Sequence, residues 1–473
     1  MPIDGSNRAD DRPGLGLAGA RTPVLTCRAL SHDRKLWLLA LLGLVARAAF
    51  LVLEPTTHPI ADERTWTNWA VENLVTDKVR FNPLRTRMIF YPPLYPYFIA
   101  APYALFGSLE AVKWAQILVS ALLVPAVGRV GGLFLGERAG LGAAAICAFY
   151  PDFIWFSVHF WSETLFLTLL WWAFERLLAA DAGRSSAAAL AAGVLWGLAI
   201  LTRETGLYFT PLAALWLSWR PAAEAGRTRA AAYLLAVALV VLPWTHRNWA
   251  LFGAFVPVST AGGLNLYQGN APLGRQEVYD RYEAVHGRVE QYRWARSMGI
   301  RAILDRQPLW IFEKLASEMP RFWEADSLAL VHIKRGAYGD VRAPVAVAAW
   351  AVTVLPYLAL LGLFVAGLAA LEWERRAVLV LGFLIVYNLL HVATHGFARY
   401  RMPIVPIVFV VAAHACVLAR QGRYPALSRR RRVIAAALAI VLVLCVSPSL
   451  LANFKDPAFG FADQQDGTRD EPR

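Results

Sequence analysis

Charged residues are scarce in this sequence. They make up 17% of the chain, whereas 57% of it is hydrophobic, with 18 tryptophans, 24 phenylalanines and 16 tyrosines. This composition is far more apolar than that of a soluble domain. Several runs approach or exceed the roughly 18 apolar residues that a membrane-spanning helix needs. The short alternating segments of a transmembrane barrel are missing, so the sequence predicts an all-α polytopic membrane protein.

Cysteine is also rare, and its placement gives no metal site or disulfide. The four cysteines have no metal-type spacing, and three of them lie in apolar runs. A Walker loop, a dinucleotide fingerprint and a zinc motif are all missing. The D-x-D pattern with which many nucleotide-sugar enzymes hold a metal is missing too, which argues against a nucleotide pocket. The cysteines are Cys27, Cys147, Cys416 and Cys445.

Acidic residues are outnumbered, and the net charge is +13. In a soluble protein this excess would suggest nucleic acid as a partner. In a membrane protein, Lys and Arg collect in cytoplasmic loops and suit anionic lipid head groups, so we predict membrane lipids and no nucleic acid. Arg28, Arg34 and Lys35 precede the first apolar run and place that end inside, as a retained signal anchor. An internal repeat, the mark of many transporters, is not found.

The apolar runs divide the chain into five parts. About 10–12 transmembrane helices are expected, together with a small outer cap and interfacial helices. The parts are a disordered cytoplasmic N-terminus (1–35), an N-terminal membrane bundle (36–244) that contains the first outer loop (54–91), an outer cap loop (245–343), C-terminal transmembrane helices (344–451) and a polar tail (452–473). Between Tyr91 and Leu135 two apolar runs must give an odd number of crossings, so one run is expected to be short or folded back.

Two adjacent carboxylates, Asp62 and Glu63, follow the first span. An acid pair in a short interfacial loop is costly near lipid unless it has a role. A carboxylate within hydrogen-bond reach can remove the proton from an attacking hydroxyl or amine, so both are candidate catalytic residues. The alternative is a helix N-terminal cap, with Asp62 and Glu63 at the start of an interfacial helix that runs to Asp77.

Further polar residues are predicted at the outer edges of later spans, against the positive-inside trend. His395, Arg399 and Arg401 form one group, and Arg203 ends another span; guanidinium groups suit phosphate oxygens. For Arg203, an ion pair with Glu163 or Glu204 is an equal alternative. The candidate substrate-binding residues are Glu163, His159, Arg247, Asn265, Tyr267 and Asn270. For Arg247 a membrane-edge anchor is the stronger alternative, and for Asn265 to Asn270 a Gly-Asn turn.

Several motifs occur in a fixed order. They are Asp62-Glu63, Tyr91-Pro-Pro-Leu-Tyr-Pro-Tyr97, Ser162-Glu163, Leu201-Thr-Arg-Glu204, Pro243-Trp-Thr-His-Arg-Asn248, Asn265-Leu-Tyr-Gln-Gly-Asn270 and Arg399-Tyr-Arg-Met-Pro403. Together they resemble the polytopic glycosyltransferases with the C-type fold, a family that includes protein O-mannosyltransferases and bacterial aminoarabinose transferases. The resemblance covers about Leu36 to Leu418. Tyr91 stands where the aminoarabinose enzymes carry a lysine, so modification of lipid A is not assigned.

The resemblance implies a polyprenyl-phosphate sugar donor and inverting transfer at the outer face of the membrane. It implies that Asp62 is the acidic catalytic residue and that basic residues, here Arg203, Arg399 and Arg401, hold the donor phosphate. The acceptor, whether lipid, polysaccharide or protein, stays open, as does a divalent cation near Asp62 or Glu63. The Ala- and Arg-rich composition with short loops favours a bacterial inner membrane. The alternative is a transporter or flippase of a lipid-linked sugar, which would need polar groups at mid-membrane depth; Arg47 and Asn388 are candidates.

Overall fold

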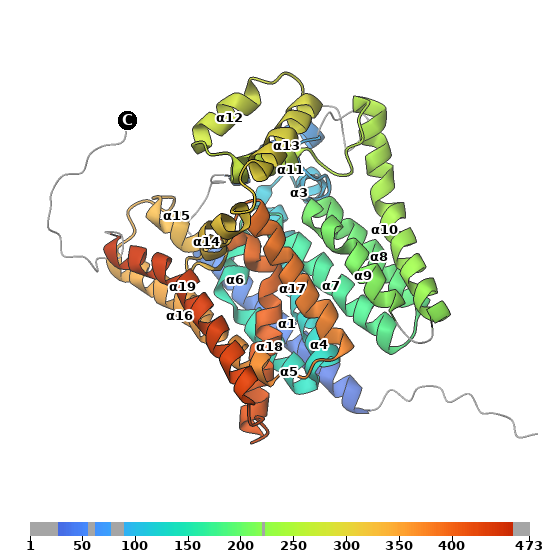
Figure 1. Ribbon diagram of the computed structural model, residues 1–473, viewed down its shortest axis with the longest axis vertical. Coiled ribbons are helices and arrows are strands. Elements are labelled where there is room, and N and C mark those ends of the chain that lie inside the picture. Colours follow the sequence, from blue (N-terminus) through green and yellow to red (C-terminus); the bar gives the residue numbers. More distant parts are fainter. Residues whose placement is uncertain (1–26, 55–61, 77–88, 220–222, 457–473) are drawn as a thin grey trace, which may run out of the picture.

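The computed structural model describes residues 27–54, 62–76, 89–219 and 223–456. All regular structure in these ranges is helical (Figure 1), which confirms the predicted all-α class. The predictions of a disordered N-terminus and a polar tail fall mostly on residues 1–26 and 457–473, which lie outside the described ranges, as do residues 55–61 and 77–88 of the first loop. At its two ends the helical structure extends past the predicted boundaries, because α1 (Cys27–Leu53) starts before Lys35 and α19 (Arg429–Lys455) ends after Leu451.

Seven helices in the described ranges are long and apolar enough to cross a membrane. They lie in α1, α4 (Leu109–Leu135), α10 (Ala223–Phe252), α16 (Ala343–Ala370), α17 (Arg375–Ala393), η3 (Ala398–Ile404) with α18 (Val405–Arg420), and α19. A pair bent by 50°, α5 (Glu137–Phe149) and α6 (Pro151–Val158), makes an eighth if it is one span. The protein is therefore a polytopic integral membrane protein.

Three further apolar runs form helices that are shorter or more charged than these spans. They are α7 (Glu163–Ala182), α8 (Ser186–Thr202), and the pair formed by η2 (Glu204–Phe209) and α9 (Thr210–Ser218). Phe174 on α7, Trp196 on α8 and Phe383 on α17 meet edge to face with ring centres 5.0–6.3 Å apart. This aromatic packing makes the shorter helices part of the central bundle.

The open question between Tyr91 and Leu135 is settled by helix length. The first run forms α3 (Leu94–Phe106), whose 13 residues extend about 20 Å and fall short of a hydrocarbon core of roughly 30 Å. The chain then turns at Gly107, whose φ of 66° lies in the left-handed region that glycine adopts without strain. The second run is α4, a full 27 residues. Only one of the two runs is long enough to cross.

A helical cap sits on one end of the bundle. Its helices α11 (Ala261–Asn270), α12 (Arg275–Glu283) and α13 (Arg288–Leu304) gather above the bundle in Figure 1. Two more, α14 (Trp310–Trp323) and α15 (Leu328–Lys334), join them to α16. The predicted boundary at residue 245 lies too early, because α10 continues through Pro243 to Phe252. We call residues 253–342 the cap and the side that carries it the cap end.

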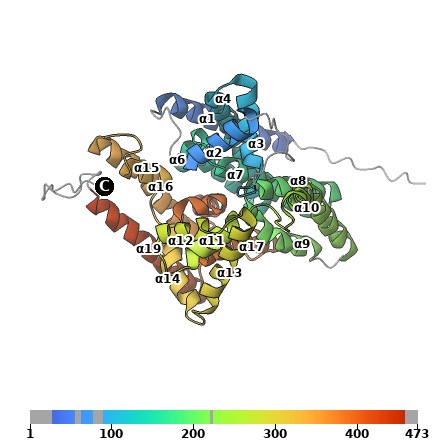
Figure 2. The same ribbon diagram turned by 90° about the horizontal axis from the view of Figure 1, so that it is seen from above.

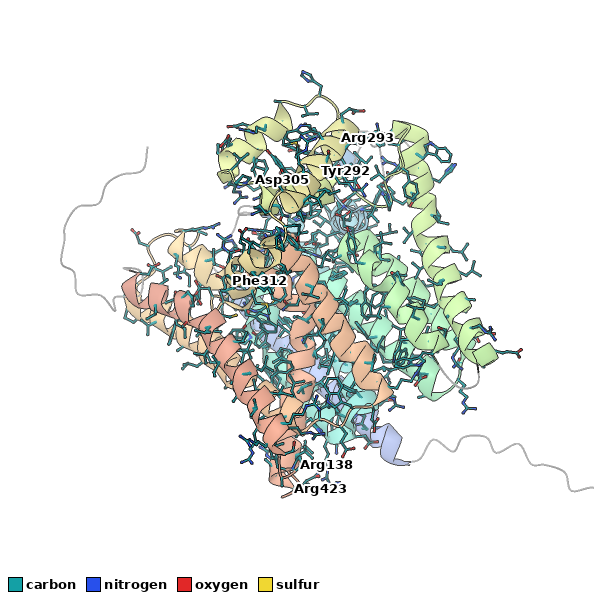
Figure 3. All side chains as sticks on the ribbon, viewed as in Figure 1. Arg138, Tyr292, Arg293, Asp305, Phe312 and Arg423 are labelled. Carbon is teal, nitrogen blue, oxygen red and sulfur yellow. The ribbon has the colours of Figure 1, made fainter. Side chains whose placement is uncertain are left out.

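The first loop returns to the cap end as a short helix. α2 (Asp62–Asn68) continues without a break into the π-helical segment η1 (Trp69–Thr76), close to the predicted interfacial helix. Seen from above, α2 lies beside α3, and α11 lies between α12 and α17 (Figure 2). Arg138 and Arg423 mark the opposite end of the molecule from Tyr292 and Arg293 of the cap (Figure 3).

Candidate functional site

Several of the predicted site residues meet at the turn between α6 and α7. We call residues 159–162, together with Glu163 at the start of α7, the α6–α7 turn. Its backbone is fixed from below by Gln116 of α4. The Gln116 amide donates to the carbonyls of Phe156 (2.9 Å), Ser157 (3.2 Å) and His159 (2.5 Å). Its own Oε1 accepts from the Tyr95 hydroxyl at 2.8 Å. A buried polar network satisfied in this way holds the turn rigid.

Glu63 attaches the first loop to this turn. Its side chain is buried, and Oε1 accepts a hydrogen bond of 2.5 Å from the backbone N–H of Phe160. Asp62 precedes it as the first residue of α2, so its Cα lies about 3.8 Å from that of Glu63. The side chain of Asp62 lies outside what the structure describes. The backbone of the predicted base therefore lies beside the α6–α7 turn.

Arg203 reaches the same turn from the end of α8. Its Nη1 lies 2.7 Å from Oε1 of Glu163 and donates to the Ser162 hydroxyl at 3.1 Å. Glu163 is only 1% exposed, and no hydrogen bond to its Oε2 is found among the described residues. The ion pair considered from the sequence is thus present, and it leaves one carboxylate oxygen of Glu163 for another donor.

Arg399 approaches from η3, on the other side of the turn. Its guanidinium lies 4.7 Å from the ring centre of Trp161 and 5.0 Å from that of Tyr400. The guanidinium of Arg203 lies 5.7 Å from the same Tyr400 ring. Two arginines from distant parts of the chain therefore converge on one tyrosine beside the turn that binds Glu63.

In the described ranges, the polar contacts of Arg401 and His395 are with residues on or just after α14, not with the α6–α7 turn. Arg401 is 1% exposed and donates to the backbone carbonyls of Phe322 and Glu324 at 3.3 and 2.6 Å. His395 is part-exposed, and its Nδ1 lies 3.6 Å from Oε2 of Glu318. The predicted phosphate-binding role of both residues stays a prediction. The contacts of Arg401 are those of a residue that holds the loop after α14.

His159 faces a pair of charged residues that sequence reasoning missed. Its Nε2 lies 3.8 Å from Oε1 of Glu54, and Glu54 pairs with Lys113 at 3.7 Å. The ring stacks on Trp155 with centres 3.9 Å apart. Burial lowers the pKa of His159 to about 3, so the imidazole is neutral at physiological pH. Glu54 ends the first apolar run and Lys113 sits near the start of α4, so only the folded chain brings them together.

Arg247 lies inside the structure at the end of α10. Its guanidinium sits 4.4 Å from the ring centre of Trp244, and Nη1 donates to Oδ1 of Asn248 at 2.8 Å. The Asn248 amide in turn donates to the carbonyl of Val256 at 2.9 Å. These contacts fit the anchoring alternative considered from the sequence, because they tie the end of α10 to the start of the cap.

The Asn265–Asn270 run lies in α11, so the Gly-Asn turn considered for it is wrong. Asn265 is exposed, whereas Tyr267 is buried. Asn270 accepts from Trp310 Nε1 at 2.8 Å and donates to the carbonyl of Ala393 at 2.9 Å. A Cβ at Gly269 would lie only 1.5 Å from the Thr394 carbonyl. Glycine is required here so that α11 can dock on the end of α17.

Within the described ranges, no three His, Cys, Asp or Glu side chains are grouped as a metal site requires. The divalent cation considered near Asp62 or Glu63 stays a prediction, since the Asp62 side chain is outside those ranges.

Residues 91–246 match the model of the dolichyl-phosphate-mannose-protein mannosyltransferase family. Among curated proteins, none matches the sequence. Among solved structures, the apo oligosaccharyltransferase of Archaeoglobus fulgidus is similar over 92% of this chain and 57% of its own, with 16% identity and a TM-score of 0.49. ArnT from Cupriavidus metallidurans bound to undecaprenyl phosphate is similar over 80% of this chain and 77% of its own, with 16% identity and a TM-score of 0.38.

The present chain thus spans less than two thirds of the length of the archaeal enzyme. The family match falls on the motifs between Tyr91 and His246 that carried the resemblance, and it confirms that resemblance for this segment. About a third of the chain, with Glu163 and Arg203 of the candidate site within it, is therefore similar to the dolichyl-phosphate-mannose-protein mannosyltransferases.

Proposed function

We propose that the protein transfers a sugar, a hexose or a pentose, from a polyprenyl-phosphate-linked donor to an acceptor. The observation that carries this proposal is the meeting of Arg203, Arg399 and the start of α2 at the α6–α7 turn. The two arginines are cations that can bind a phosphate, and the start of α2 brings the loop that carries Asp62 and Glu63 to the same place. The matched family is named for a donor of this class. The acceptor can be a lipid, a polysaccharide or a protein.

The arginines serve the leaving group. In the donor, the phosphate is a diester with one negative charge. When the bond from the anomeric carbon to the phosphate oxygen breaks, the polyprenyl phosphate leaves as a monoester with a second negative charge. Arg399, and Arg203 while paired with Glu163, stabilise that developing charge more than the charge of the bound donor. Differential stabilisation of this kind lowers the barrier.

Asp62 serves the acceptor. The acceptor hydroxyl or amine attacks the anomeric carbon, forms the new bond and gives its proton to the Asp62 carboxylate. A single displacement inverts the configuration at that carbon. Glu63 acts as a positioning residue, because its hydrogen bond with Phe160 N–H fixes the start of α2. We propose that the reaction takes place at the extracytoplasmic face of a bacterial inner membrane.

The transporter alternative receives no support from Arg47, one of the two polar residues considered inside the spans. Arg47 is fully buried and donates to Ser120 (2.8 Å) and to the carbonyls of Gly43 (2.9 Å) and Ala148 (2.8 Å). These bonds tie α1 to α4 and α5. The side chain that seemed suited to a transport path is therefore committed to helix packing.

The test is transfer of label from synthetic polyprenyl-phosphate sugars by the purified protein in lipid. We expect one donor to be consumed in the presence of membrane acceptors. Asp62→Asn should lower the rate at least about 100-fold, which is the usual contribution of a general base, without loss of donor binding. Glu72→Gln is the matched control, because Glu72 is an exposed acid on η1 of the same loop.

Full transfer activity in Asp62→Asn would remove Asp62 from the mechanism. If no donor is consumed even with crude membrane acceptors, the glycosyltransferase proposal is wrong. Movement of labelled lipid-linked sugar between leaflets, measured on the same preparation, would then establish the transporter.

A further inference from the structure

A pocket lies between the first loop and the cap. It has a volume of about 290 Å³ and lies between η1, the segment 89–91 and the cap helices α11 to α13. Five aromatic rings line it: Trp69, Phe90, Tyr91, Tyr279 and Tyr282. The predicted phosphate-binding arginines are not among its lining residues, so it is distinct from the phosphate site proposed above.

The walls of this pocket are held in place by backbone and side-chain bonds. The N–H groups of Thr260 and Ala261 donate to the carbonyls of Ile89 and Phe90 at 2.9 and 3.2 Å, which join the segment 89–91 to the start of α11. The ring of Tyr91 meets Phe90 edge to face with centres 4.7 Å apart. The aromatic surface is therefore formed before any ligand binds.

Two charged residues complete the lining. Glu283 ends α12 and Arg288 begins α13, and Gly287, at a φ of 91°, allows the turn that sets them side by side. Their side chains approach to 3.4 Å. Arg288 also donates to Gln291 Oε1 at 2.9 Å and lies 5.7 Å from the Phe90 ring centre. The side chains of Arg288 and Glu283 are 50% and 58% exposed. Arg288 therefore offers hydrogen-bond donors, and Glu283 an acceptor, at the edge of the aromatic surface.

Aromatic faces bordered by a carboxylate and a guanidinium match the chemistry of a sugar ring. The C–H face of a pyranose packs on an aromatic ring, and its hydroxyls bond to charged groups at its edge. A prenyl chain would leave Glu283 and Arg288 without a use. A phosphate would be repelled by Glu283. The volume lies at the lower end of the range for small-molecule sites, which suits a single ring.

The pocket also adjoins the helix that carries the proposed base. Thr65 and Trp69 line it, and Asp62 lies three residues, less than one helical turn, before Thr65 in α2. The helix changes from α to π geometry at Trp69 itself. π-Helical turns are rare in proteins, and those that occur are often found at functional sites.

We propose that this pocket binds a sugar ring of a saccharide acceptor and directs its hydroxyl toward α2. The role as acceptor site rests on the proposed function, whereas the binding of a sugar does not.

Binding is tested by saturation-transfer NMR on the full chain in lipid nanodiscs. The probes are the methyl glycosides of glucose, mannose, galactose and N-acetylglucosamine, with a serine-containing peptide as the other class. We expect one glycoside to bind, and Tyr279→Ala and Glu283→Gln each to weaken it about tenfold. Tyr424→Ala, a tyrosine next to Arg423 at the opposite end, and Glu277→Gln, an exposed acid on α12 away from the pocket, should bind as the native chain does.

Glycoside binding unchanged in both pocket variants would overturn the proposal, as would binding of the peptide but of no glycoside. The acceptor KM separates this proposal from the proposed function. If transfer occurs and Tyr279→Ala does not raise the acceptor KM, the acceptor pocket is wrong and the transferase stands. If a glycoside binds at Tyr279 and Glu283 but no polyprenyl-phosphate sugar is consumed, the pocket stands and the transferase is wrong.

Discussion

Arg399 and Arg401 are two residues apart and have different surroundings. Both lie in η3, a 3₁₀ segment, in which successive side chains are about 120° apart, so positions i and i+2 point in different directions. Arg399 contacts the rings of Trp161 and Tyr400 at the α6–α7 turn. Arg401 donates hydrogen bonds to backbone carbonyls inside the protein. Sequence alone grouped them as one phosphate site, because no acid is adjacent to either.

Substitution should separate the two arginines. Arg399→Ala removes a cation from the proposed phosphate site, and we expect kcat/KM for the donor to fall roughly 100-fold, as for loss of one transition-state charge contact. Its melting temperature should change little. Arg401→Ala leaves buried carbonyls without donors and should cost at least about 3 kcal/mol of folding stability. The measurements are initial rates and thermal unfolding in the same detergent.

Arg203 is a poorer choice for this comparison, because its removal would leave Glu163 buried without its counterion. Equal loss of stability in Arg399→Ala and Arg401→Ala, with equal donor kinetics, would mean that Arg399 is a packing residue as well.

Glu204 joins the bundle to the cap. It begins η2, and its Oε2 accepts from the Ser259 hydroxyl at 2.8 Å. A Cβ at Gly262 would lie 2.6 Å from its Oε1, so glycine permits the approach of the carboxylate to the start of α11. Desolvation raises the pKa of Glu204 to about 7, against the hydrogen bonds from Ser259 and Gly262 that lower it. Protonation of this residue therefore occurs near physiological pH.

The raised pKa gives a definite pH dependence. Between about pH 4.5, where the unfolded carboxyl titrates, and about pH 7, the folded state holds one proton more than the unfolded state. Stability therefore falls as the pH rises through this window and is level above it. The loss is about 2 kcal/mol after allowance for the partial exposure of the group. Glu204→Gln should melt at a similar temperature to the native chain at pH 5 and at a higher temperature at pH 8.

Thermal unfolding at the two pH values measures this effect. Glu224→Gln is the matched control, since Glu224 is an exposed acid in the first turn of α10. A native-like pH profile in Glu204→Gln would show that another group titrates in this window.

Element positions were largely predictable, while their junctions were not. Apolar length located α1, α4 and the later spans, since burial in lipid demands continuous runs. The end of α10 was missed, because polar residues after Pro243 look like a loop although a helix inside a bundle tolerates proline. The π-helical start at Trp69 also has no local signal. The hydrogen bond between Glu63 and Phe160 joins residues 97 apart in sequence, and no local pattern predicts such a contact.

Basic residues gather at one end of the protein. Arg138 and Arg423 lie at the end away from the cap (Figure 3). The run Arg429–Arg432 begins α19 only six residues after Arg423. Since basic residues collect on the cytoplasmic side, the cap and the α6–α7 turn should face the opposite side. A polyprenyl chain would then lie along the bundle with its phosphate at the cap end, where Arg399 and Arg203 lie. The proposed chemistry thus depends on the orientation of the entire protein.

Cysteine labelling in intact cells tests that orientation. In a background with all four native cysteines replaced by alanine, Glu277→Cys places a thiol on the exposed surface of α12, and Arg423→Cys places one at the other end. We expect a membrane-impermeant maleimide to label Glu277→Cys in whole cells and Arg423→Cys only after the membrane is permeabilised. Each variant is the control for the other, because both should react fully once the membrane is opened. Labelling in the reverse order would put the cap inside the cell, away from extracytoplasmic acceptors, and the proposed reaction would have to occur on the cytoplasmic face.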